Sequence, residues 1–250
     1  QKTVLVTSNF DNVGSLPCNT SIGGPAKGII VREIDALGGQ MPKTADKTYL
    51  QMKMLNTAKG PGVQSLRAQA DKKVYPRYMQ EVLKKQENLD IIEGMVEDLI
   101  VEDNCVKGVI LDNGQTIEGR MVILTTGTYL KAEILCGDQK HASGPDQQKE
   151  SKYLSEKLAN LGMRIQRLKT GTPPRVEINS VDYSKTSLQP GTDANLAFSY
   201  QTNEFIPIEE QTPCYLTYTN EKTHQIIRDN LHRSSMYSGI VKGIGPRYCP

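Results

Sequence analysis

The alternation of apolar and polar positions early in the chain predicts a strand followed by helices. Residues 3–7 are β-branched or apolar and are followed by turn-forming residues, which indicates a short buried strand. Residues 26–37 have helical spacing, and the glycine pair after them would end the helix. We expect residues 63–86 to be mostly helical, with Pro76 as a kink or boundary.

The pattern changes after residue 88, where short strand-like runs follow one another. They cover residues 89–93, 96–102, 106–111 and 115–118. Asp103-Asn104 is a turn between two of these runs. Asp112-Asn113-Gly114 predicts a hairpin of type I′, which needs positive φ at two positions. The apolar run Met121–Thr126 is typical of a parallel strand buried on both faces.

This order of elements indicates an α/β protein. A strand, helices, a second strand, a three-stranded antiparallel meander and a last buried strand form the layout of a glutathione-reductase-type, FAD/NAD(P)-binding Rossmann-like domain. An unrelated α/β domain with a hairpin would give a similar pattern. We also expect a helix over 151–161, capped by Ser151 or a neighbour, and a strand over 163–168. The polar, irregular sequence that follows indicates an inserted mixed α+β domain, which divides the chain into domains 1–170 and 171–250.

Composition limits the class of protein. Hydrophobic residues make up 37% and charged residues 23% of the chain, as in an ordinary water-soluble protein. The apolar stretches fall short of the ~20 residues that a membrane helix needs, so we expect no membrane association. A net charge of +2 does not indicate nucleic-acid binding, although a local basic patch can act within a near-neutral chain. Five cysteines without a C-x-x-C pair argue against a metal site and favour a reducing, cytosolic compartment.

The segment from Cys18 to residue 28 is the most unusual stretch, because the G-x-G-x-x-G fingerprint is absent from the chain. Gly23 and Gly24 would let the backbone approach a ligand, and the helix after them would point N–H groups at an anion beside Lys27. In that setting Cys18 would be a reactive thiolate. The alternative is a glycine-rich turn with a buried structural cysteine. Gly127, after the last apolar run, is a further candidate for close approach to a nucleotide.

Two segments near the end of the chain also carry chemistry. In the first, Gly245-Pro246-Arg247-Tyr248-Cys249-Pro250, the thiol of Cys249 would act as a nucleophile or a proton donor, unless the segment is only a rigid surface turn. In the second, Asn220–His224, a carboxylate, an ammonium and an imidazole follow one another. The alternative there is a polar helix start that an asparagine or threonine caps.

Several segments, taken in order, resemble the MnmG (GidA) family of tRNA-modifying flavoproteins. They are residues 18–28, 31–39, 59–63, 67–71, 122–128, 168–175, 213–215, 219–224 and 245–250. One motif of this kind would be weak, whereas an ordered series along the whole chain is specific.

The resemblance implies an activity and its cofactors. MnmG enzymes use FAD, NADH and methylenetetrahydrofolate. With the GTPase MnmE they place an aminomethyl or carboxymethylaminomethyl group on C5 of the wobble uridine of certain tRNAs. By resemblance, Cys18 and Cys249 correspond to the two cysteines implicated in this function. Val96 and Ser151 match positions that contact FAD, and Gly245–Pro250 begins the segment assigned to NAD.

The resemblance also implies where the chain lies within such a protein. Family members begin with a strand and a G-G-G-H-A-G turn that binds the pyrophosphate of FAD, and we expect this chain to be an internal piece that starts after that turn. By itself it would bind FAD weakly or not at all. The C-terminal region that binds MnmE would also lie outside it. The expected protein is a homodimer, cytoplasmic or organellar, that acts on the tRNA anticodon loop.

Two other functions are open. A folate-dependent tRNA uridine methyltransferase shares the FAD fold and the substrate class, but lacks the long insertion that carries residues 213–224 and 245–250. The second alternative is a catalytically inactive module that only binds a protein or RNA. Residues 142–150 depart from the family's usual glycine- and proline-rich loop ahead of Ser151, where FAD contacts are expected.

Overall fold

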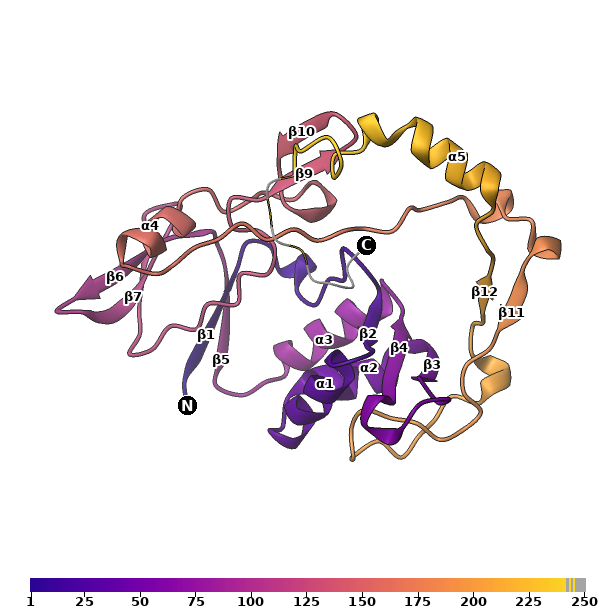
Figure 1. The fold of residues 1–250 in the computed structure, drawn as a ribbon. Coiled ribbons are helices and arrows are strands. Elements are labelled where there is room, and N and C mark those ends of the chain that lie inside the picture. The colour runs from indigo at the N-terminus through magenta and orange to yellow at the C-terminus, as the bar shows by residue number, and fades with distance from the viewer. Residues whose placement is uncertain (242, 244, 246–250) are drawn as a thin grey trace. The chain divides into compact units, whose positions relative to one another are not determined.

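Two compact units make up the chain, and each is assembled from separate stretches of sequence (Figure 1). The computed structural model describes residues 1–241, 243 and 245. The first unit comprises Gln1–Phe10, Glu87–Thr172 and Thr219–Pro250, and the second comprises Asp11–Gln86 and Pro173–Tyr218. The functional division into domains 1–170 and 171–250 stays a prediction.

The second unit is built around an antiparallel sheet in the order β2-β4-β3. These strands are β2 (Ser21–Gly23), β3 (Tyr49–Leu55) and β4 (Ser65–Ala70). Helices α1 (Lys27–Ala36), α2 (Gln40–Thr48) and α3 (Val74–Lys84) pack beside them (Figure 1). Residues 173–218 contribute a short antiparallel pair, β11 (Ser187–Gln189) with β12 (Cys214–Leu216), and the side chain of Phe198, which is fully buried in the core of the sheet and helices.

Strand β4 corrects the expectation of a helix over residues 63–86. Leu66 and Ala68 are buried while Arg67 between them is exposed, which is the two-residue period of a strand. Pairing with both β2 and β3 outweighs the helical propensity of this alanine- and glutamine-containing run. The helix starts only at Val74, and Pro76 lies in its first turn, where the N–H that proline lacks has no helical partner to lose.

The first unit contains a parallel pair of strands and the predicted meander. β1 (Thr3–Thr7) pairs with β5 (Leu89–Glu93) in parallel. The prediction of a strand over residues 3–7 is confirmed, but its burial is not, because its first two residues are exposed. Strands β6 (Val96–Glu102), β7 (Cys105–Leu111) and β8 (Thr116–Glu118) pair antiparallel in that order, as the sequence predicts.

The turns of the meander differ in type from the prediction. The left-handed pair is Asp103 (φ 47°) and Asn104 (φ 60°), which matches the demands of a two-residue type I′ turn. In the second turn only Gly114 has a positive φ, of 81°. The Asp112–Gly114 hairpin is therefore present, but the type I′ geometry lies one turn earlier.

Two expected strands are absent from the described residues. Met121–Thr126 pairs with no described strand, and Met121 and Ile123 are 85% and 86% exposed. Residues 163–168 likewise form no named strand. An apolar run becomes a strand only where another strand offers its N–H and C=O groups. Of these two segments, only Leu168 lies in a β-bridge in the described chain.

The remaining elements of the first unit follow the meander. β9 (Glu133–Cys136) and β10 (Gln139–Ala142) form a hairpin that the sequence did not suggest. α4 (Leu154–Asn160) is shorter than the expected helix over 151–161. Its N-cap residue, Tyr153, makes no side-chain capping bond, so Ser151 is not a cap. α5 (Glu221–Asp229) begins where the polar helix start was expected.

Candidate functional site

The glycines of the 18–28 segment make room for protein atoms. A Cβ on Gly23, whose φ is 88°, would lie 2.3 Å from the Leu66 carbonyl oxygen and 2.6 Å from Phe198 Cζ. A Cβ on Gly28 would lie 2.6 Å from Ser65 Oγ. Only Gly24 (φ 91°) has open space around it. Of Gly23 and Gly24, only Gly24 therefore leaves room for an added methyl group.

The start of α1 uses some of its backbone donors within the protein. Gly24 N donates to the Leu66 carbonyl (2.7 Å), and Gly28 N donates to the carbonyl of Gly24 (2.7 Å). Ala26, the residue before the helix, has a φ of 62°. Lys27 is exposed at the first helical position.

Cys18 lies on the loop that leads into β2 and is half-buried. Its carbonyl oxygen accepts a hydrogen bond from Arg175 Nη2 at 3.2 Å. Arg175 belongs to the second stretch of this unit, so the two stretches meet at the predicted reactive cysteine. The role of the Cys18 thiol stays a prediction.

A set of acidic and backbone groups that the sequence did not indicate holds the 197–202 loop onto the helices of the second unit. Asp46 Oδ1 accepts from Phe198 N (2.8 Å), and its Oδ2 accepts from Ser199 N (2.8 Å) and Thr202 Oγ1 (2.7 Å). Burial raises the pKa of the Asp46 carboxyl above its ordinary value, against the lowering effect of these hydrogen bonds.

A second carboxylate and an arginine on α1 complete this anchor. Asp35 Oδ2 accepts from Tyr200 N at 3.0 Å, while its buried Oδ1 has no hydrogen-bond partner within the described part of the chain. Arg32 donates to the Ala197 carbonyl (3.1 Å), and its guanidinium lies 5.7 Å from the centre of the Tyr200 ring. No local sequence signal could have found this anchor, because its members are more than 150 positions apart.

In the first unit, the side chain of Ser151 is buried beside a short backbone bridge. Ser151 is 5% exposed and bridges in parallel to Leu130. Its N donates to the Tyr129 carbonyl (2.9 Å) and its carbonyl accepts from Lys131 N (2.7 Å). Its side-chain oxygen has no hydrogen-bond partner among the residues that the structure describes. Buried hydroxyls are rarely left without a hydrogen bond, so this position suits contact with a bound group.

Gly127 lies in the turn next to the same backbone bridge. Its φ is 55°, and a Cβ there would lie 3.4 Å from the Tyr129 ring. Gly144 also accommodates this ring, since a Cβ there would lie 2.7 Å from it. The Tyr129 hydroxyl donates to Gln148 Oε1 at 2.5 Å. Through Tyr129, the structure brings together the predicted cofactor residues Gly127 and Ser151.

Ion pairs fasten the segment around α4 onto the meander. Lys149 Nζ lies 2.8 Å from Asp112 Oδ2, and Lys157 Nζ lies 2.8 Å from Asp98 Oδ2. The hydrogen bond from Lys149 holds the pKa of the Asp112 carboxyl below its ordinary value. Val96, at the start of β6 and half-buried, is two residues from one of these anchors. The two residues that the resemblance assigns to FAD are thus on adjoining parts of one unit.

The end of the chain is described only at Gly245. A Cβ on Gly245 would lie 2.4 Å from Lys169 Cε, so the glycine packs against that side chain. The other predicted residues of this motif are Pro246, Arg247, Tyr248, Cys249 and Pro250, which lie outside the described residues.

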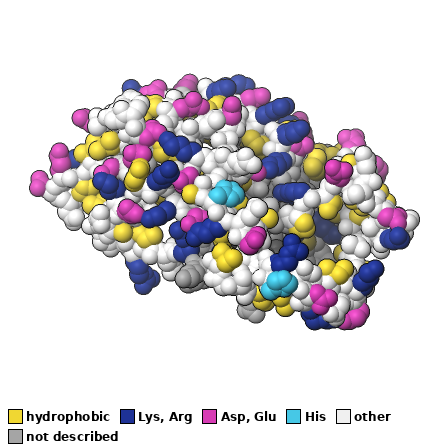
Figure 2. Space-filling view, turned by 90° about the horizontal axis from the view of Figure 1, so that it is seen from above, with side chains coloured by type: hydrophobic (Ala, Val, Ile, Leu, Met, Phe, Trp, Pro, Cys, Tyr) yellow, Lys and Arg dark blue, Asp and Glu magenta, His cyan; other side chains and the backbone are white. Residues whose placement is uncertain are grey.

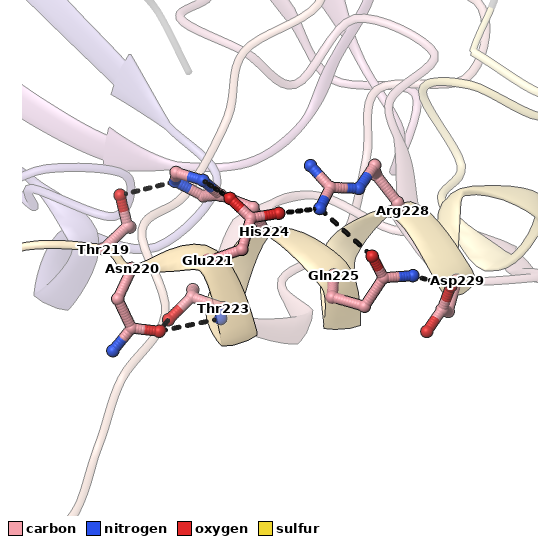
Figure 3. A network of polar contacts seen from close by, with 8 residues as sticks. All are labelled: Thr219, Asn220, Glu221, Thr223, His224, Gln225, Arg228 and Asp229. Atoms are coloured by element: carbon pink, nitrogen blue, oxygen red, sulfur yellow. Dashed lines mark hydrogen bonds and ion pairs between the residues drawn. The ribbon is translucent and has the colours of Figure 1, made fainter.

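The polar run at 219–224 forms a network at the start of α5 (Figure 3). Asn220 Oδ1 accepts from Thr223 N at 3.0 Å, which confirms the capped helix start that was the alternative for this run. The network also contains contacts that capping does not require. His224 Nε2 lies 2.9 Å from Thr219 Oγ1, and His224 Nδ1 lies 3.9 Å from Glu221 Oε2.

The surface carries both signs of charge. Figure 2 shows Lys and Arg side chains interspersed with Asp and Glu over the face in view, in keeping with the net charge of +2. Across the described ranges, no group of three or more His, Cys, Asp or Glu side chains is placed to hold a metal ion. Helices of a length and apolarity that would cross a bilayer are not found in this part of the chain.

Comparison with known proteins decides the family. The family described as Glucose inhibited division protein A matches residues 1–250. The chain belongs to this GidA family. The result confirms the resemblance inferred from the ordered segments.

Individual GidA relatives agree with this assignment. The tRNA uridine 5-carboxymethylaminomethyl modification enzyme MnmG of Geobacillus kaustophilus is 57% identical over 249 residues, which are 100% of this chain and 39% of that protein. The enzyme of the same name from Bacillus subtilis is 56% identical over the same share. The structure of Aquifex aeolicus GidA matches with a TM-score of 0.90 and 47% identity, over 100% of this chain and 42% of that one. The chain thus spans about two-fifths of the length of these relatives.

Proposed function

We propose that the protein containing this chain is an FAD-dependent tRNA-modifying enzyme. With the GTPase MnmE it would add an aminomethyl or carboxymethylaminomethyl group to C5 of the wobble uridine. The observation that carries the proposal is the 57% identity, over the full chain, to an enzyme whose name states this uridine modification. Because the chain spans 39% of that relative, the activity is proposed for the whole protein.

FAD fits the first unit at Ser151. The buried Ser151 hydroxyl lacks a hydrogen-bond partner in residues 1–241, 243 and 245, and a bound nucleotide would supply one. Val96 and Gly127 would form the adjoining surface, within a glutathione-reductase-type domain over residues 1–170. When bound, the flavin supplies hydride transfer and carries the one-carbon unit. Residues 171–250 would be the inserted domain.

The other cosubstrates are assigned by the family resemblance. NADH would reduce the flavin, and Gly245–Pro250 would begin its binding segment. Methylenetetrahydrofolate would donate the carbon. The thiols of Cys18 and Cys249 would add to the pyrimidine or carry protons. Lys27 would contribute positive charge beside Gly24. The whole protein would act as a cytoplasmic or organellar homodimer on the tRNA anticodon loop, where bases can be splayed out of the stack.

The reaction is tested with the full-length protein, its GTPase partner, FAD, NADH, methylenetetrahydrofolate, a nitrogen donor and tRNA. Mass spectrometry of the digested tRNA is expected to show an aminomethyl-type wobble uridine that both Cys18→Ser and Cys249→Ser abolish. A simple methyl adduct would instead identify a folate-dependent methyltransferase. Normal tRNA binding without any adduct would identify an inactive binding module.

The cofactor site is tested by Ser151→Ala in the full-length protein. Loss of one hydrogen bond to FAD is expected to weaken FAD binding by roughly 2- to 13-fold. The matched control is Ser155→Ala, at a buried serine within α4, which should leave the flavin content unchanged. Equal flavin content and equal affinity in both variants would rule out a Ser151–FAD contact.

A further inference from the structure

A hydroxyl, an imidazole and a carboxylate follow one another at the start of α5 (Figure 3). Thr219 Oγ1 lies 2.9 Å from Nε2 of His224, and the opposite ring nitrogen lies 3.9 Å from Glu221 Oε2. The second carboxylate oxygen of Glu221 receives a hydrogen bond from Arg228. Each ring nitrogen of His224 therefore faces one polar partner.

Helix geometry brings these groups together, but helix stability does not require them. Glu221 and His224 are three positions apart, which places them on one face of α5. The capping bonds come from Asn220, whose side-chain oxygen accepts from Thr223 N and Thr223 Oγ1. The Thr219–His224 contact adds nothing to this cap.

The order of the three groups is suited to proton transfer. An imidazole with a hydroxyl at one nitrogen can take a proton through that hydroxyl, and a carboxylate at the other nitrogen stabilises the cation that forms. At 3.9 Å the Glu221 carboxylate acts through its charge. The His224 side chain is 47% exposed, so a macromolecular substrate can reach it.

The proposed modification supplies a proton that needs an acceptor. A substituent joined to C5 of uridine through carbon replaces the C5 hydrogen, which must leave as a proton once the new bond has formed. We propose that Thr219 and His224 form the relay that accepts this proton, with Glu221 balancing the charge on the imidazole. This inference rests on the proposed tRNA uridine modification.

The step balances as follows. The C5–H bond breaks as its proton passes to Thr219 Oγ, and the hydroxyl proton of Thr219 passes to Nε2 of His224. The electron pair of the C5–H bond forms the C5=C6 double bond. An enzyme thiolate that had added to C6 leaves with the pair of its C6–S bond. The imidazolium then loses its proton to water, which restores the relay.

The relay is tested in the full-length protein with its GTPase partner, cosubstrates and tRNA that carries tritium at C5 of uridine. Tritium released to water reports the proton-removal step, and mass spectrometry reports the modified nucleoside. His224→Gln is expected to lower tritium release at saturating tRNA by roughly 100- to 10,000-fold, with KM for tRNA unchanged. The acidic limb of the pH–rate profile should disappear in this variant.

Matched variants separate a relay from a structural role. Thr219→Ser keeps the hydroxyl and should retain most of the activity, whereas Thr219→Val should lose it. His232→Gln removes another exposed histidine, in the turn Leu231–Arg233, and should behave as wild type. Tritium release by His224→Gln equal to wild type, or a raised KM with unchanged turnover, overturns the relay. A wild-type protein that releases no tritium and modifies no tRNA overturns the proposed function itself.

Discussion

A few buried polar side chains decide where residues 197–202 lie. Asp46 receives two backbone amides and one hydroxyl from this loop, and Asp35 receives a third amide. Buried N–H groups need such acceptors, because each unmade hydrogen bond costs about 1–3 kcal/mol. The aspartates therefore hold the Phe198 backbone where its ring fills the core.

Asp46→Asn is expected to loosen this loop. In the wild type, one carboxylate oxygen accepts hydrogen bonds from Ser199 N and Thr202 Oγ1. In the variant an NH₂ group would face these two donors, which is expected to lower the free energy of unfolding by about 1–3 kcal/mol. Hydrogen exchange of the peptide around Phe198 in the full-length protein measures the loss. Glu204→Gln, which removes an exposed ion pair with Lys47, is the control and should leave exchange unchanged.

The pH dependence of the same variant has a definite sign. Burial raises the pKa of Asp46 from 3.8, so the folded protein holds this proton more tightly than the unfolded chain. The contribution of Asp46 to stability is complete below pH 3.8 and declines as pH rises through the raised pKa. The stability difference between wild type and Asp46→Asn should shrink over this window. A difference that grows with pH would contradict the assignment.

Gly23 and Gly24 form a second residue-scale test, because both have φ near 90° but different surroundings. Gly23→Ala would place a methyl group against Leu66 and Phe198 and is expected to cost about 2–5 kcal/mol. Gly24→Ala meets no atom within 4 Å and should cost only about 1–2 kcal/mol of backbone strain. Exchange rates of β2 and β4 peptides compare the two. If both variants lost the same stability, the contacts of Gly23 with Leu66 and Phe198 would not explain the cost of its substitution.

At the scale of elements, the meander shows how turn chemistry determines pairing. The Asp103-Asn104 turn has two left-handed residues, and Glu102 pairs with Cys105 directly across it. Short polar side chains tolerate this conformation better than others. The turn therefore sets the register of β6 against β7.

Substitutions at the two asparagines of the meander should act in opposite order. Asn104→Ala puts alanine at a φ of 60° and should cost about 1 kcal/mol, whereas Asn104→Gly should be nearly neutral. At Asn113, whose φ is not positive, glycine gains no relief and should cost about 0.5–1 kcal/mol. Hydrogen exchange of the β7 peptide measures the stability cost of each substitution. If Asn113→Gly stabilised the protein, the two left-handed residues would have to be assigned to the second turn instead of the first.

Local patterns predicted the elements that local interactions build. The meander, α1 and the cap of α5 follow from residue spacing and turn formers, and all were expected. The pattern failed where partners distant in sequence decide. Residues 65–70 form a strand because β2 and β3 flank them, and residues 121–126 form none because no described strand does. Of the candidate site, the glycine turn was evident from sequence, whereas the Asp46 anchor and the isolated Ser151 hydroxyl needed the structure.

At the scale of the whole molecule, neither unit is a continuous piece of chain. Phe198 illustrates the consequence, because it completes a core whose other buried members lie between residues 22 and 75. The stability of residues 11–86 therefore depends on a side chain from the later stretch.

Phe198→Ala in the full-length protein is expected to cost about 3–5 kcal/mol. Hydrogen exchange should rise in α1, α2 and β4, which are far from Phe198 in sequence. The meander β6-β7-β8 belongs to the other unit and should stay protected. Leu154→Ala, in the first unit, should reverse the pattern. Uniform loss of protection in both variants would mean that the two units unfold together.

The separation of Asp46 and Phe198 in the sequence also determines how long Asp46 is without its partner during translation. The two residues are 152 positions apart, and at about 5–20 residues per second the gap takes roughly 8 to 30 s to translate. During this interval the apolar residues that pack with Phe198 in the folded protein lack the phenylalanine ring. Until Phe198 is synthesised, the emerging chain exposes an apolar surface that chaperones can bind. A mutation that slows translation between these two positions would prolong this exposure.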